Sequence, residues 1–181
     1  SEDHLNEQVS TRGSSCTSVD AFIYALHRGD KKRWLIPIEW KFTEFYGNKD
    51  KSKEDRRGEA KGTNGKGEER LKRYSVLIDE SSQLKSLKSY AGSVYYQEPF
   101  YQLMRQTLWA ENVVKHKATE VLTADDYLHI HVIPEGNRDL LDKRYKVSGK
   151  GMEETWREML ANQSKYVIIT PKKLMEPVAP R

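Results

Sequence analysis

The feature that most constrains the fold is an alternating segment, residues 33–42, that follows a short apolar segment and a turn. In RWLIPIEWKF the bulky apolar residues fall on one face of a strand, while Glu39 and Lys41 fall on the other, because side chains alternate between the two faces of a β-strand. The preceding residues 19–26, VDAFIYAL, are rich in β-branched and aromatic types and are followed by Gly29, which favours a strand and then a turn. The two segments predict an antiparallel hairpin.

The expected register of this hairpin brings two acidic residues together. A two-residue loop at Gly29 and Asp30 sets Asp20 directly across from Glu39, since the loop length fixes which residues pair. Like charges in that position are unfavourable by about 0.2 to 1 kcal/mol, and a bound cation would reverse the sign. Lys41 lies two residues further along the same face and is predicted to stand beside that cation.

These residue types match the chemistry of phosphodiester hydrolysis. Mg²⁺ takes oxygen ligands from one or two carboxylates, keeps several waters and bridges to a substrate phosphate, and Mn²⁺ could substitute for it. Asp20 and Glu39 are therefore the predicted metal ligands. An ammonium group nearby can orient the attacking water or stabilise charge that develops on the phosphate, which is the role predicted for Lys41.

The rest of the chain predicts one α/β domain over residues 1–181 with a mixed sheet flanked by helices. A charged, glycine-rich segment at 47–67 predicts a mobile basic loop. Hydrophobic spacing then predicts further elements, which are a helix around 68–78, a helix at 99–115, a strand at 127–134, a helix at 152–163 and a strand at 165–170. The chain after residue 171 is predicted to be a loose tail.

Composition permits a nucleic-acid partner without requiring one. The 31 Lys and Arg residues exceed the 27 Asp and Glu residues for a net charge of +4, which allows attraction to a polyanion. The single cysteine, Cys16, cannot form a disulfide within the chain. No segment approaches the roughly 20 apolar residues of a membrane span, so we expect a cytoplasmic protein without a membrane partner.

The motif Asp20, eighteen intervening residues and then Glu39-Trp40-Lys41 resembles the PD-(D/E)XK nuclease superfamily. More narrowly, VDAFIYAL, IPIEWKF and EPFYQLMRQT resemble a group of bacterial proteins described as restriction endonucleases. The resemblance implies a restriction-endonuclease-like fold and a Mg²⁺-dependent endonuclease that acts on double-stranded DNA, in some members as a homodimer. Val19 replaces the proline that names the motif, and residues 1–18 leave little room for the first helix and strand of that fold.

The resemblance also nominates residues outside the hairpin. Some members carry a glutamine-containing polar motif on the helix that follows, and Gln102, Arg105 and Gln106 resemble it, which implies contact with the substrate phosphate. A helix-borne acid before the motif assists metal binding in some relatives, and Glu7 is the candidate here.

Two other classes of function fit the sequence. A non-catalytic module could keep the fold and bind nucleic acid through its basic loop, in which case binding would not depend on metal. A structural subunit would bind no nucleic acid even at low salt, where electrostatic attraction is strongest. The spacing of His129 and His131 could also serve a transition metal, but that reading needs further ligands, and none is evident in the sequence.

Overall fold

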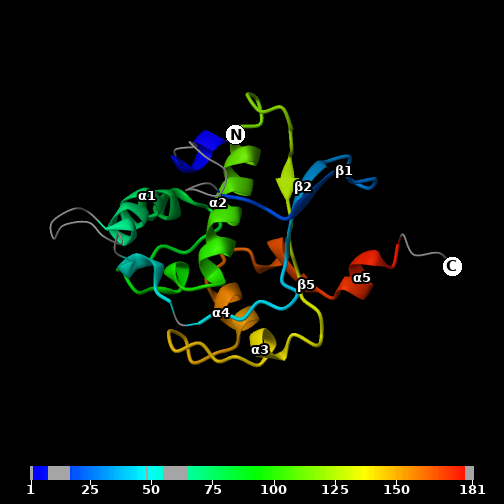
Figure 1. Cartoon of the computed structure of the whole chain (residues 1–181). Helices are drawn as coiled ribbons and strands as arrows, with labels where there is room; N and C mark the ends of the chain where they lie inside the picture. Colours follow the sequence, from blue (N-terminus) through cyan, green and yellow to red (C-terminus); the bar gives the residue numbers. More distant parts are fainter. Residues whose placement is uncertain (1, 8–16, 48, 55–64, 178–181) are drawn as a thin grey trace.

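The computed structural model describes residues 2–7, 17–47, 49–54 and 65–177, and it contains five strands and five α-helices within those ranges (Figure 1). The strands are β1 Ala21–Leu26, β2 Arg33–Trp40, β3 Asp126–Tyr127, β4 His129–Val132 and β5 Tyr166–Ile169. The α-helices are α1 Lys66–Glu80, α2 Phe100–Lys115, α3 Arg138–Leu141, α4 Met152–Glu158 and α5 Pro171–Met175, and 3₁₀ helices lie at Glu2–Leu5, Lys51–Lys53, Val94–Tyr96 and Gln163–Lys165.

The strands form one mixed sheet in the order β1-β2-β4-β5, with β3 also paired to β2. β1 and β2 are antiparallel, whereas β2, β4 and β5 run parallel. Parallel neighbours need a crossover connection, and α2 lies within the connection from β2 to β4 while α4 lies within that from β4 to β5. The predicted α/β fold with a mixed, helix-flanked sheet is confirmed.

The hairpin has the predicted register but a longer turn. Ala21 pairs with Ile38 and Leu26 pairs with Arg33, which is the register that places Asp20 across from Glu39. The turn spans four residues instead of two, because the Lys31 amide donates to the His27 carbonyl at 3.0 Å. A four-residue loop centred on the same point as a two-residue loop gives the same pairing, so the error in turn length left the register unchanged.

The helices cover the face of the sheet that carries Glu39 and Lys41. Figure 1 shows α1, α2 and α4 on one side of the sheet and α5 on the other. Leu35, which shares the face of Glu39, is fully buried and packs against Ala110 and Val113 of α2. Tyr166 of β5 packs against Trp156 of α4 with their ring centroids 6.4 Å apart. The predicted catalytic residues therefore lie on the core side of the sheet.

α2 is the helix that spacing predicted at 99–115. Its predicted stripe is buried, with Phe100, Leu103, Met104, Thr107 and Leu108 each no more than 3% exposed, because residues at this spacing share one face of a helix. α4 is shorter than the predicted helix at 152–163 and ends at Glu158, after which Leu160 forms a bridge with Leu84.

Two segments predicted to be irregular contain ordered structure. Within the predicted 47–67 loop, a 3₁₀ helix forms at Lys51–Lys53 and α1 begins at Lys66, while residues 55–64 lie outside the described ranges. Gly67 packs so closely on Ser52 that an added Cβ would lie 2.1 Å from the Ser52 carbonyl oxygen, which only glycine allows.

The tail predicted after residue 171 begins instead with helix α5. Its N-terminus is capped by Thr170, whose hydroxyl accepts a hydrogen bond from the Lys173 amide at 3.2 Å. Pro171 at the first helical position suits this start, because its missing N–H has no partner there in any helix. None of the helices in the described ranges is long and apolar enough to span a bilayer.

Candidate functional site

The site is built on the end of β2. Glu39 and Lys41 are 3% and 4% exposed, and their side chains form an ion pair between Lys41 Nζ and Glu39 Oε1. Asp20, just before β1, is exposed, and its Oδ2 accepts a hydrogen bond from the Trp40 amide at 2.7 Å. The hairpin thus brings all three predicted residues to one end of the β1–β2 pair.

Gln106 of α2 holds the carboxylate of Glu39 from the helix side. Its Nε2 donates to Glu39 Oε2 and also to the Ser18 carbonyl at 2.9 Å. Burial raises the pKa of Glu39, while Lys41 and Gln106 act to lower it and the nearby Asp20 acts to raise it. One amide of α2 therefore links the acidic residue of β2 to the segment that carries Asp20.

Lys41 is fixed at both its backbone and its ammonium group. Its amide donates to the Val132 carbonyl at 2.9 Å, and its own carbonyl accepts from Asn137 Nδ2 at 3.3 Å. Burial acts to lower the pKa of Lys41, but hydrogen bonds to Glu39 and to Tyr46 outweigh it and raise the pKa above the ordinary value. Lys41 is thus a charged and well-positioned cation at neutral pH.

Tyr46 was missed by sequence reasoning and belongs to the site. Lys41 Nζ lies 5.7 Å from the centre of its ring, and the Tyr46 hydroxyl donates to Gln102 Oε1 at 3.2 Å. Gln102 therefore contacts the site through Tyr46. The segment after β2 has no periodicity that could have predicted this contact.

Glu98 is a second residue that the sequence did not single out. Its side chain is 17% exposed, and Lys51 Nζ lies 3.8 Å from its Oε1. Its other oxygen, Oε2, is buried and has no hydrogen-bond partner within the described ranges. Burial raises the pKa of Glu98, against Lys51, Lys41 and Arg105, which lower it. Only its place just before Pro99 at the start of α2 could have drawn attention to it.

Replacing Glu98 by glutamine is expected to stabilise the protein at neutral pH. Because the folded-state pKa of Glu98 lies above its ordinary value of 4.5, the folded protein favours the protonated form, and stability from this group is lost as pH rises. Urea unfolding should show a gain for Glu98→Gln at neutral pH that shrinks as pH falls toward 4.5. An equal or lower stability at neutral pH would contradict this account of Glu98.

Glu7 and Arg105 are paired with each other. Arg105 Nη2 lies 2.9 Å from Glu7 Oε1, and the Glu7 carboxylate also accepts from Tyr74 and from Thr17. The Arg105 guanidinium lies over the ring of Tyr101 as well, 5.3 Å from its centre. The structure thus gives both residues partners within the protein, and their predicted roles toward metal and phosphate stay predictions.

The two histidines of β4 are buried beside the site. His131 pairs with Glu39 in the parallel register of β2 and β4, and its Nδ1 lies 2.8 Å from the Tyr166 hydroxyl. Burial lowers the pKa of His129 to about 4, which keeps this ring neutral. Among the described residues no group of three His, Cys, Asp or Glu side chains could hold a metal. Two carboxylates completed by water still fit Mg²⁺, which takes one or two protein carboxylates.

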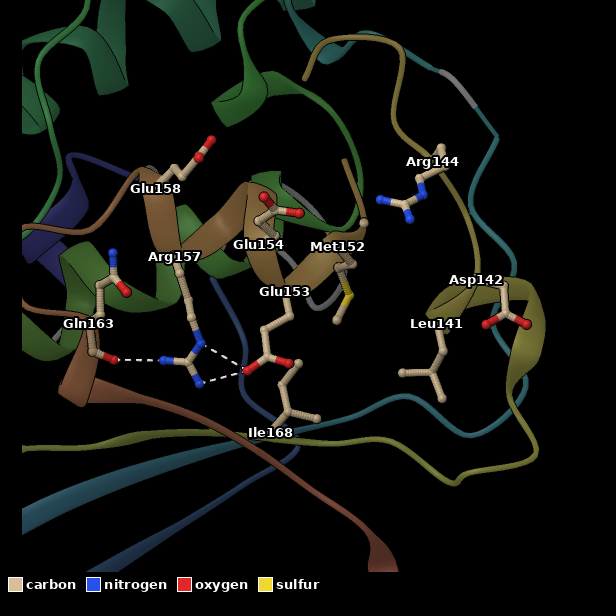
Figure 2. A pocket seen from close by; sticks show the side chains of 11 residues that line it. Leu141, Asp142, Arg144, Met152, Glu153, Glu154, Arg157, Glu158, Gln163 and Ile168 are labelled. Atoms are coloured by element: carbon tan, nitrogen blue, oxygen red, sulfur yellow. Dashed lines mark hydrogen bonds and ion pairs between the residues drawn. The ribbon is translucent and has the colours of Figure 1, made fainter. Parts of the chain in front are cut away.

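A separate hollow lies on the surface between α3, α4 and β5 (Figure 2). Its volume is about 840 Å³, and Arg157, one of its lining residues, pairs with Glu153 at 2.7 Å and donates to the Gln163 carbonyl at 2.8 Å. None of the residues predicted to be catalytic lines it. Arg157 and Glu153 neutralise each other in an ion pair. The β1–β2 hairpin therefore remains the candidate catalytic site.

Comparisons with known proteins place the chain in a family. No curated protein and no solved structure matches this chain. A family described as "Restriction Endonuclease associating with ARP" matches residues 2–181. That span includes the hairpin, α2 and the rest of the described fold. The chain therefore belongs to this restriction-endonuclease family.

Proposed function

We propose that this protein is a PD-(D/E)XK endonuclease that hydrolyses phosphodiester bonds of double-stranded DNA with Mg²⁺, or with Mn²⁺ in its place. Membership of a restriction-endonuclease family supports a nuclease-type function with DNA as partner. The observation that carries the more specific proposal is the hairpin register, which sets Asp20 opposite Glu39 with Lys41 on the same face. The buried ion pair at the end of that hairpin has a desolvation penalty. A catalytic role for Glu39 and Lys41 would explain why the fold keeps it.

Each residue of the hairpin has a distinct role in this proposal. Asp20 and Glu39 would hold the cation, which supplies Lewis-acid stabilisation of charge on the phosphate. Lys41 orients the attacking water or stabilises negative charge as it develops, and its raised pKa keeps it charged for that purpose. Gln106 holds the Glu39 carboxylate in place.

The remaining expected residues and partners extend the proposal. Gln102, Arg105 and Gln106 would contact the substrate phosphate, and Glu7 would assist with metal. For these roles Glu7 and Arg105 have to leave their ion pair, and Gln106 has to release one of the two acceptors of its Nε2. We also propose that the protein is cytoplasmic and that it associates with ARP, as the family description states.

The direct test is cleavage of supercoiled plasmid by the purified protein with Mg²⁺, with Mn²⁺ and with a chelator. We expect nicking or linearisation with either metal and none with the chelator. Single-stranded DNA and RNA of the same sequence test the preference for double-stranded DNA. Metal-independent cleavage would contradict the proposed mechanism.

The alternative is a non-catalytic module that binds nucleic acid on the same fold. It predicts retention of labelled DNA by the protein without metal, together with no cleavage under any metal condition. Binding of that kind falls steeply with salt, since phosphate contacts release counterions. A salt series of DNA retention in chelator, run beside the plasmid assay, separates the two functions.

Tyr46→Phe is expected to lower kcat by about 10-fold while changing KM less, because it removes one hydrogen bond to a charged group and keeps the ring. Tyr145→Phe is the matched control. The Tyr145 hydroxyl is buried without a partner in the described ranges, and its ring also lies near a lysine, 4.8 Å from Lys143 Nζ. Equal kcat values for the two variants would show that the Tyr46 hydroxyl does not position Lys41.

A further inference from the structure

β1 is an edge strand of the sheet that the described residues form. β1 stands at the end of the sheet order, and no strand in the described ranges pairs with its outer side. Its six residues, AFIYAL, include no charged residue and no proline. Natural proteins normally protect such edges with charges, prolines or bulges, because an open edge is a template for pairing with another chain.

This edge also carries exposed apolar side chains. Phe22 is 50% exposed, Ile23 45%, Tyr24 39% and Leu26 60%. Phe22, Tyr24 and Leu26 share one face of the strand, while Ile23 points to the other. Contiguous exposed apolar residues of this kind mark surfaces that contact other proteins.

Within the described ranges, the outer edge of β1 has unpaired backbone groups at three of these four residues. The His27 amide donates to the Lys32 carbonyl at 2.8 Å, and inter-strand bonds in an antiparallel pair involve alternate residues. The backbone groups of Ala21, Ile23 and Ala25 therefore point toward β2. Those of Phe22, Tyr24 and Leu26 point toward the outer edge.

We propose that β1 pairs antiparallel with β1 of a second copy of this chain, about a two-fold axis at Tyr24. The two sheets become one continuous sheet. Phe22 lies opposite the partner's Leu26, and Tyr24 lies opposite the partner's Tyr24. Every outward-facing backbone group of the strand gains a partner in this register, because both members of each pair direct their N–H and C=O across the edge.

Charge complementarity selects this register over its neighbours. Shifting the axis to Ile23 puts Leu26 opposite the partner's Asp20, and shifting it to Ala25 puts Phe22 opposite the partner's Arg28. The register centred on Tyr24 places apolar residues opposite apolar residues. It also places Asp20, just before the strand, at the same end as the partner's Arg28, which lies in the turn after the strand, so that unlike charges share each end of the paired strands.

The dimer is expected to dissociate readily. A six-residue strand spans about 20 Å, and an edge contact of this length falls in the small, weak class of interfaces. The expected Kd is therefore micromolar, and the protein should be mostly dimeric at about 100 μM. This inference does not depend on nuclease activity, and neither experiment below measures cleavage.

Disulfide trapping tests the register. In a Cys16→Ser background, which removes the native thiol, Tyr24→Cys should form a covalent dimer on mild oxidation. Cα atoms of a hydrogen-bonded pair lie about 5.5 Å apart, within the range that a disulfide spans. Ile23→Cys is the matched control, because position 23 faces the partner's Ala25 and is too far from its own copy. No dimer from Tyr24→Cys, or as much from Ile23→Cys, would overturn the proposal.

Sedimentation equilibrium tests the assembly itself. Wild type should be mostly dimeric at about 100 μM, and Tyr24→Lys should be monomeric because two ammonium groups would face each other at the axis. Val76→Lys is the control, since Val76 is 57% exposed on α1, which lies away from β1 (Figure 1), and it should dimerise like wild type. A monomeric wild type at this concentration, or a Tyr24→Lys variant that dimerises like wild type, would overturn the proposal.

Discussion

Asp20→Asn is expected to reduce metal-dependent DNA cleavage by at least about 100-fold, the scale on which loss of one preorganised electrostatic group acts. Asparagine keeps an oxygen that accepts the hydrogen bond from the Trp40 amide, but it removes the negative charge needed to hold a cation. Because Asp20 is exposed, the change in the free energy of unfolding should stay within about 0.5 kcal/mol. The measurement is the initial rate of plasmid nicking together with urea unfolding.

Asp30→Asn is the control for this variant. Asp30 is an exposed acid at the other end of the same hairpin, where it accepts from the Lys32 amide at 3.0 Å. The Asp30→Asn variant should therefore cleave DNA at the wild-type rate. If Asp20→Asn also keeps that rate, Asp20 is not a ligand for the catalytic metal and the proposed site loses one of its two carboxylates.

Lys41→Met is expected to destabilise the fold by about 3 to 5 kcal/mol as well as abolish cleavage. The variant leaves the buried Glu39 carboxylate without its cation, and breaking a buried ion pair by removing one partner costs energy on that scale. Urea or thermal unfolding measures the loss of stability. Inactivity of Lys41→Met therefore proves a chemical role only when the variant is shown to be folded under the assay conditions.

The double variant Glu39→Gln with Lys41→Met separates stability from chemistry. Removing both charges takes away the uncompensated carboxylate, so stability should recover most of the loss, while cleavage stays absent. Gln106 can still contact an amide at position 39. A double variant that is as unstable as Lys41→Met alone would show that the ion pair does not explain the loss.

Much of the hairpin could be predicted because its pairing follows from local pattern. The alternation in β2 and the position of the turn fixed which residues of the two strands face each other, and the register at Ala21 and Ile38 confirms it. The turn length was wrong, since the left-handed backbone of Lys31, with φ of 59°, is not specified by composition alone. The sequence also did not show that the face with Glu39 and Lys41 is the core side. Charged residues normally indicate a solvent-exposed face, and only the packing of α2 buries these two.

Residues supplied by irregular segments could not be predicted. Tyr46 follows β2 in a segment without regular structure, and Glu98 precedes α2, so neither belongs to a periodic pattern. Their position at the site depends on how distant segments pack around α2. The same reason explains the shortened α4, where tertiary contacts of Leu160 with Leu84 end the helix before its apolar spacing does.

The measurement that tests the central claim most directly is calorimetric titration of Mn²⁺ into wild type and Glu39→Gln, paired with plasmid nicking in the same metal. The account predicts that wild type binds Mn²⁺ and nicks DNA, and that both properties vanish together in Glu39→Gln. Failure of wild type to bind metal and to nick DNA would contradict the account and favour the non-catalytic module.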